Sequence, residues 1–169
     1  MREAIGATWI TGIVLAFIAL FSGYLALSIN YSKAFKVKDG IVDRIEKHGG
    51  PNAASLNDIA NMLEEIGYNS KGNCSVIDSA HNSYIGVNKS SPSGRNPGSG
   101  TYNYCLMKIN SKNNTPANGI GDNKGQFESA YYRVVVFFSL SLPIVQDFAN
   151  FYITGETINI NYPEDDYMD

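Results

Sequence analysis

The side chains that most often catalyse reactions or bind metals are few and scattered in this sequence. His48 and His81 are the two histidines, and neither has a cysteine or an acidic residue at a spacing typical of metal ligands. A zinc site requires three or four such donors. His48 instead follows a predicted helix, where an imidazole complements the negative end of the helix dipole. We therefore predict no metal site.

Two further segments resemble ligand-binding loops only in part. Asp122–Gly125 is polar like a calcium loop, but such a loop needs further oxygen ligands and a glutamate at a later position than Glu128. Asn88–Gly100 contains three glycines but does not open a helix, as a phosphate-binding loop does. No set of nucleophile, base and orienting group can be assembled. We expect no catalytic residues, no cofactor and no enzyme activity, and we identify no small-molecule substrate.

Cys74 and Cys105 are the only cysteines and offer one possible crosslink. An isolated pair is the minimum for a disulfide, which persists in oxidising compartments. A bridge here would close a loop of about 31 residues and contribute ~3–4 kcal/mol on the chain-entropy model. We predict the disulfide; two buried free thiols are the alternative.

The strongest signal in the sequence is a long apolar segment near its start. No residue is charged between Glu3 and Lys33, whereas ~20 apolar residues already span a hydrocarbon core of ~30 Å as a helix. Trp9 lies near one end, and Tyr24 or Tyr31 near the other, as expected for aromatic residues at membrane interfaces. The alternative is a cleaved signal peptide, whose apolar part would be only ~7–15 residues. We therefore predict a retained transmembrane helix.

The charges around this segment leave its orientation in conflict. Arg2 precedes it, whereas five lysine and arginine residues follow within 33–47, so the positive-inside rule would place the rest of the chain in the cytoplasm. The cysteine pair, together with long stretches rich in Asn, Ser, Gly and Pro, favours export. We predict an extracytoplasmic C-terminal domain, with the cytoplasmic orientation as the alternative.

Helical spacing of apolar residues continues beyond the membrane segment as far as Ile45. The run His48-Gly49-Gly50-Pro51 ends this pattern, so one helix over residues 4–47 would be about 66 Å long. A second helix is predicted from Ser55 as its N-cap to a stop at Gly67. Its short length requires its apolar face to pack against another element.

A spacing of two then predicts strands. The strand candidates are Cys74–Ile77, Tyr84–Val87, Tyr102–Ile109 and Tyr131–Leu142, with Phe151–Ile160 as an antiparallel partner of the last. Asn88–Gly100 and Asn110–Gln126 contain many helix and strand breakers and are predicted to be exposed loops. The predicted fold class is α+β: a long N-terminal helix, with a transmembrane half and an amphipathic stem, and a second helix packed on a small antiparallel β-sheet.

Length and charge limit the domains and the partners. At 169 residues, the chain has room for a transmembrane helix at 1–32 and one domain at 33–169 that includes the helical stem. The net charge of −3 argues against a nucleic-acid partner, which would require a basic surface.

Small residues recur along the transmembrane helix at spacings of three and four. They are Gly12, Ala16, Ala19 and Gly23. Such rows let two helix backbones approach closely in lipid, so we predict self-association through this row. The alternative is that Gly and Ala are simply frequent in membrane helices.

This layout resembles type IV pilin-like proteins, and most closely the TadE-like minor pilins and pseudopilins. The resemblance extends to the C-terminal region, where Tyr132–Leu142 is followed by Pro143 and by the returning segment Phe151–Ile158. It implies a structural subunit of a cell-surface filament or secretion-type pilus, associating with its own copies or with other pilin-like subunits. It also implies that Glu3 sets the register of neighbouring helices.

A second functional hypothesis comes from the long polar stretches. Functional residues often lie on loops, so Asn88–Gly100 and Asn110–Gln126 could contact a ligand. The chain would then be a membrane-tethered binding or sensing module.

Overall fold

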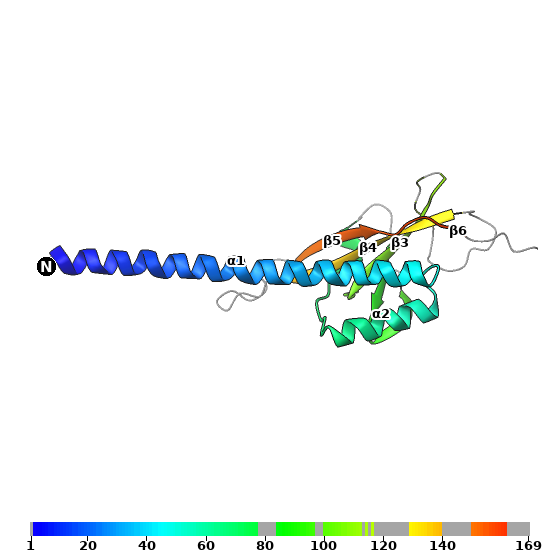
Figure 1. The fold of residues 1–169 in the computed structure, drawn as a ribbon, viewed down its shortest axis with the longest axis horizontal. Coiled ribbons are helices and arrows are strands. Elements are labelled where there is room, and N and C mark those ends of the chain that lie inside the picture. The colour runs from blue at the N-terminus through cyan, green and yellow to red at the C-terminus, as the bar shows by residue number, and fades with distance from the viewer. Residues whose placement is uncertain are drawn as a thin grey trace, which may run out of the picture.

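The computed structural model describes residues 2–77, 84–96, 100–112, 114, 116, 129–139 and 150–161. A long helix, a short helix and a six-stranded antiparallel sheet form this part of the chain. The α+β prediction is therefore confirmed. Helix α1, Arg2–Lys47, extends far beyond every other element at its N-terminal end (Figure 1).

Helix α1 falls into two parts with different surroundings. We call Thr8–Leu25 the anchor segment and Lys33–Lys47 the stem. No side chain of the anchor segment is buried, whereas the stem packs against the rest of the molecule. The stem, helix α2 and the sheet together form the head.

The stem ends at Lys47, as predicted from the glycines that follow it. Gly49 and Gly50 have φ angles of 67° and 136°, a region that favours glycine because it has no Cβ. The Gly50 N–H donates to the carbonyl of Ile45 at 2.8 Å, which satisfies one of the free carbonyls at the helix end.

Helix α2, Ala53–Glu65, starts earlier than predicted. Its N-cap is Asn52, whose Oδ1 accepts a hydrogen bond from the Ser55 N–H at 2.8 Å. The prediction of Ser55 as N-cap is wrong, because the asparagine already supplies the oxygen three residues earlier and the Ser55 hydroxyl donates to the Gly50 carbonyl. The predicted stop at Gly67 is confirmed, with φ at 64° and the Tyr68 N–H donating to the Leu63 carbonyl at 2.8 Å.

Six antiparallel strands make the sheet. They are β1 Ile85–Asn88, β2 Ser91–Asn96, β3 Tyr104–Asn110, β4 Ser129–Ser139, β5 Asn150–Glu156 and β6 Ile160–Asn161. Their order is β2-β1-β3-β4-β5, and β6 pairs with the start of β4. The predicted return strand is confirmed, since Val136 pairs with Ile153 in the β4–β5 register.

Two further predictions of local structure are wrong. Cys74–Val76 is a 3₁₀ turn rather than a strand, because the Asn73 side chain accepts from the Ser75 N–H at 2.9 Å and caps the turn. Ser91–Asn96 is strand β2 rather than part of an exposed loop. A short turn after Asn88 returns the chain onto β1, where antiparallel backbone pairing holds the polar strand, and β2 also contacts α2.

Two further predicted segments are only partly described. The end of the Tyr131–Leu142 strand and the following Pro143 lie outside the described residues, as does most of Asn110–Gln126.

The core has a layer on each face of the sheet. The larger layer lies between the sheet and the two helices, with the stem contacting α2, β4 and β5 (Figure 1). On β4, Val134 and Val136 point into this layer, while Val135 and Phe137 point into the second. Val135 and Phe137 are buried, so the second face of the sheet is also covered.

The second face is covered by the segment that follows α2. Gly72 pairs with Tyr102, and a Cβ at Gly72 would lie only 2.2 Å from the Phe137 ring. Glycine therefore lets this segment pass directly over the ring. The Cys74–Cys105 bridge then ties the same segment to β3.

Candidate membrane and assembly helix

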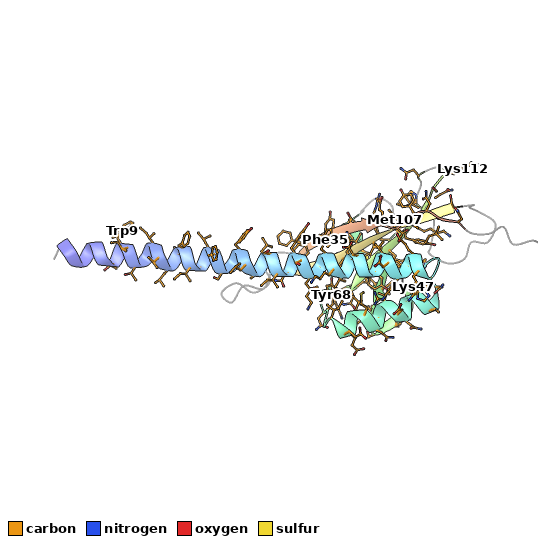
Figure 2. The ribbon with its side chains drawn as sticks, in the orientation of Figure 1. Trp9, Phe35, Lys47, Tyr68, Met107 and Lys112 are labelled. Atoms are coloured by element: carbon orange, nitrogen blue, oxygen red, sulfur yellow. A yellow bond between two sulfur atoms is a disulfide. The ribbon has the colours of Figure 1, made fainter. Side chains whose placement is uncertain are left out.

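The anchor segment exposes large apolar side chains around the whole helix. Trp9, Phe17 and Leu20 are 72%, 67% and 74% exposed, and side chains project from all visible sides of the helix (Figure 2). Fully burying one such side chain is worth roughly 1.5–3 kcal/mol. A helix exposed in this way in water would be strongly driven to associate with lipid or with other apolar helices.

The length of the anchor segment fits a bilayer. Thr8–Leu25 measures ~27 Å at 1.5 Å per residue, close to the ~30 Å thickness of a hydrocarbon core. Among the described residues, α1 is the one helix long and apolar enough to cross a membrane. Its backbone hydrogen bonds lie within the helix, as a lipid environment requires.

The predicted packing row lies on this exposed surface. Gly12, Ala16 and Ala19 are exposed, and Gly23 is half-buried. A Cβ added at Gly12 would meet no atom within 4 Å, so this position is open to a neighbouring helix. Glu3 belongs to α1, but its side chain lies outside the described residues.

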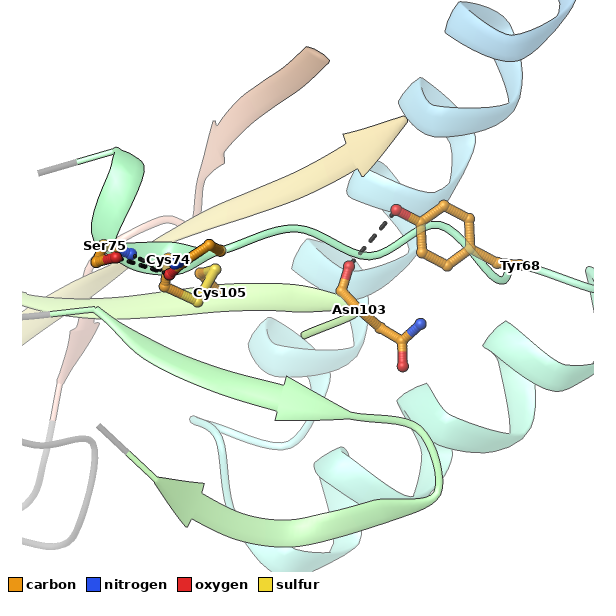
Figure 3. The surroundings of a disulfide bond; sticks show 6 residues. Tyr68, Cys74, Ser75, Asn103 and Cys105 are labelled. Carbon is orange, nitrogen blue, oxygen red and sulfur yellow. Dashed lines mark hydrogen bonds between the residues drawn. A yellow bond between two sulfur atoms is a disulfide. The ribbon is translucent and has the colours of Figure 1, made fainter. Parts of the chain in front are cut away.

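The predicted disulfide is present. Cys74 and Cys105 are bonded, with 5.8 Å between their Cα atoms, and both are buried. The bridge joins the 3₁₀ turn to the central strand β3 (Figure 3). The alternative of two free thiols is therefore wrong.

A hydrogen-bond network at Tyr68 also holds the segment after α2 against the sheet, on the side of the head nearer the anchor segment. The Tyr68 hydroxyl donates to the Phe137 carbonyl and, at 3.5 Å, to the Asn103 carbonyl (Figure 3). The Asn103 side chain accepts from the Lys89 N–H at 3.0 Å and donates to the Ser70 carbonyl at 3.2 Å. Burial raises the pKa of Tyr68, more than its hydrogen bond to Phe137 lowers it. Asn103 is a buried residue whose side chain connects two separate segments. The sequence around it does not indicate this role, and we did not predict it.

Arg44, His48 and Asp58 join the far end of the stem to α2. Asp58 lies 3.4 Å from both the His48 Nε2 and the Arg44 Nε. The hydrogen bond with His48 is the main cause that lowers the pKa of Asp58 below its usual 3.8. His48 therefore has a side-chain partner in addition to its place at the helix end.

The described part of the chain contains no cluster of potential metal ligands. No three His, Cys, Asp or Glu side chains there lie close enough together to hold a metal ion. The features that stand out are instead an apolar surface, a covalent bridge and the contacts that hold the head on its stem.

Comparison with known proteins adds no family. No protein-family model matches this chain, and neither a curated protein nor a solved structure matches it. The resemblance to pilin-like proteins thus depends on the layout of the helix and the sheet, and it stays a hypothesis.

Proposed function

We propose that this chain is a membrane-anchored structural subunit that assembles through the anchor segment of α1, in the manner of a pilin-like protein. The observation that carries this proposal is the continuity of α1. One uninterrupted helix runs from an anchor segment with no buried side chain into a stem whose Val37, Ile41 and Ile45 are fully buried in the head.

This continuity connects assembly mechanically to the head. An apolar helix joined through a flexible linker would only tether its domain, whereas a continuous helix fixes the position and direction of the head. Neighbouring chains whose anchor segments pack side by side would therefore present their heads in a fixed arrangement. Such an arrangement suits a subunit of an ordered assembly.

The packing row gives the proposed helix contact a specific face. Gly12, Ala16, Ala19 and Gly23 are small enough to let a second helix approach closely. In a membrane, lipid would cover the other faces of the segment. In a filament, further copies of the helix would cover them.

The disulfide supports placing the head outside the cytoplasm. Buried disulfides persist in oxidising compartments and are rare where thiols are kept reduced. The basic residues that follow the anchor segment favour the opposite orientation. We place more weight on the disulfide, because it joins two buried cysteines across the core of the head.

The assembly proposal is tested by enlarging the packing row. Cells would express the chain tagged at its C-terminus, either unchanged or with Ala16→Leu, and sheared material would be examined by negative-stain microscopy with gold label on the tag. We expect labelled filaments for the unchanged chain and few for the variant. Crosslinking in membranes would report helix contacts that form before any filament.

Val14→Leu is the matched control, because position 14 lies about 200° around the helix from Ala16. It should leave crosslinking in membranes unchanged, because lipid covers this face there. Equal crosslinking in all three chains would contradict the proposed contact face. Surface label without filaments or crosslinks would contradict assembly altogether.

A further inference from the structure

Four aromatic side chains from distant parts of the sequence meet where α1 enters the head. The Phe138 and Phe151 rings stack with 5.3 Å between their centroids, and Tyr31 packs edge-on against Phe138 at 5.9 Å. Phe35 lies one helical turn further along α1, 6.2 Å from Tyr31 (Figure 2). We call Tyr31, Phe35, Phe138 and Phe151 the aromatic belt.

Most of the aromatic belt is open to its surroundings. Tyr31, Phe35 and Phe151 are 49%, 43% and 41% exposed, whereas Phe138 is buried beneath them. Strand β5 begins at Asn150, at the end of the sheet nearest the anchor segment (Figure 1). The belt therefore forms the side of the head that faces back along the anchor segment.

Polar and basic groups lie at the same level on another side of α1. Asn30 and Lys33 line a hollow of about 430 Å³ together with Tyr68 and Asn69. The Lys33 ammonium donates to the Gly67 carbonyl at 3.2 Å. Aromatic rings beside lysines and amides suit the region between hydrocarbon and water, where amphipathic rings concentrate and where phosphates are available to lysine.

The spacing along α1 matches this level to a membrane surface. Trp9 and Tyr31 are separated by about 33 Å of helix, close to the ~30 Å hydrocarbon thickness. If Trp9 lies at one interface, the aromatic belt therefore lies at the other. We propose that the aromatic belt seats the head directly on the lipid interface, so that the head rests on the membrane instead of standing away from it. This inference depends on the proposed insertion of the anchor segment.

The occupant that we assign to the belt is lipid. Apolar side chains connect the anchor segment to the belt along α1, since Leu27 packs against the core of the head and Tyr31, one helical turn later, packs against Phe138. Lys33 and Lys36 lie about 200° and 140° around α1 from Tyr31. These lysines would repel the same lysines of a second copy and attract anionic headgroups. A lipid interface satisfies the rings and the lysines together.

Tryptophan fluorescence in the full chain can test this seating. The sequence contains a single tryptophan, Trp9, so the unchanged chain reports on the anchor segment. Two reporters for the belt combine Trp9→Phe with either Phe151→Trp or Phe35→Trp. A control combines Trp9→Phe with Ile158→Trp, because Ile158 is 67% exposed and its N–H donates to Glu46 near the far end of the stem.

Each chain would be reconstituted into vesicles of phosphatidylcholine and phosphatidylglycerol, with and without bromine near the glycerol end of the acyl chains. Bromine in both leaflets makes the result independent of insertion direction. We expect the brominated lipid to quench Trp9 and both belt reporters, and to leave the Ile158→Trp chain unquenched. Circular dichroism would verify that each variant folds. If only one of the two belt reporters folds, that reporter alone is enough for the test.

Three outcomes would overturn the inference. If Trp9 is quenched but the belt reporters are quenched no more than the Ile158→Trp control, the head stands away from the membrane and only the proposed anchor survives. If Trp9 itself is not quenched, the proposed membrane insertion fails as well. If the belt reporters are shielded from water but unquenched, and dilution in the vesicles exposes them, a second protein copy covers the belt instead of lipid.

Discussion

The anchor segment and the stem belong to one helix, yet they meet opposite surroundings. Ile13 and Ile18 in the anchor segment are 63% and 57% exposed, whereas Ile41 and Ile45 in the stem are fully buried. The stem confines its buried residues to one stripe and places charged residues on the other sides, but the anchor segment is apolar all round. A stripe indicates packing against protein, and an all-round apolar surface indicates lipid or other helices.

The sharpest test of this difference places one charge in each half of the helix. Ile41→Asp would bury an unpaired carboxylate, at a cost on the order of 3–5 kcal/mol, and should unfold the head. Ile18→Asp should instead weaken membrane insertion by about 3 kcal/mol and leave the head folded. Limited proteolysis would report folding, and membrane fractionation would report insertion.

These two readouts serve as controls for each other. The Ile41→Asp chain should stay in the membrane fraction although its head is digested. If each substitution damaged both folding and insertion equally, the division of α1 into an anchor and a stem would be wrong.

The disulfide should strengthen the head without affecting the anchor. Replacing both Cys74 and Cys105 by Ala should lower the free energy of unfolding by ~3–4 kcal/mol, because the unfolded chain regains the freedom of a long loop. Urea unfolding in detergent would measure the loss. Reducing agent should lower the stability of the unchanged chain and leave that of the double variant as it was; membrane fractionation should be the same for both.

Two buried tyrosines show how the quality of packing varies within the head. Tyr68→Phe removes the hydrogen bond to the Phe137 carbonyl and should destabilise the head by about 1–2 kcal/mol. The Tyr104 hydroxyl is buried and has no hydrogen-bond partner among the described residues, so Tyr104→Phe should be neutral or stabilising by about 1 kcal/mol. Thermal unfolding of both variants would compare them. Equal losses would mean that the Tyr104 hydroxyl is satisfied.

The smallest effect concerns pH at the far end of the stem. The pKa of Asp58 is lowered in the folded state, mainly by its hydrogen bond with His48. The resulting stability is therefore present above the ordinary aspartate pKa of about 3.9 and is lost as the pH falls through the lower, folded value. Asp58→Asn should flatten the dependence of stability on pH in this acidic range. Because the Asp58 side chain is partly exposed to solvent, salt should weaken the effect. An identical pH profile for the variant would contradict this account.

Sequence patterns predicted well those parts that depend on local chemistry. The absence of charged residues between Glu3 and Lys33 indicated the anchor segment, and the apolar stripe through Val37, Ile41 and Ile45 indicated the stem. Gly49 and Gly50 ended the helix because their backbone conformations are difficult for other residues. The disulfide could be predicted because the sequence contains two cysteines, which allow only one pairing.

Features that depend on long-range pairing could not be predicted in the same way. Strand β2 contains Pro92 and Gly94, which are depleted in strands, and it forms because β1 offers a free edge. Phe138 and Phe151 lie more than a hundred residues after Tyr31. The β4–β5 pairing brings the two phenylalanine rings together, and the packing of α1 on β4 adds Tyr31. The aromatic belt therefore has no signature along the chain.

The central claim is that the anchor segment spans a membrane and holds the head outside the cytoplasm. It is tested most directly in cells that express the chain with a tag after Asp169. Any outer envelope is removed, the cytoplasmic membrane is left intact, and protease is added from outside. We predict that external protease removes the tag and that the remaining anchor fragment stays in the membrane at alkaline pH. A tag that is cleaved only after the cells are lysed would place the head in the cytoplasm and contradict the claim.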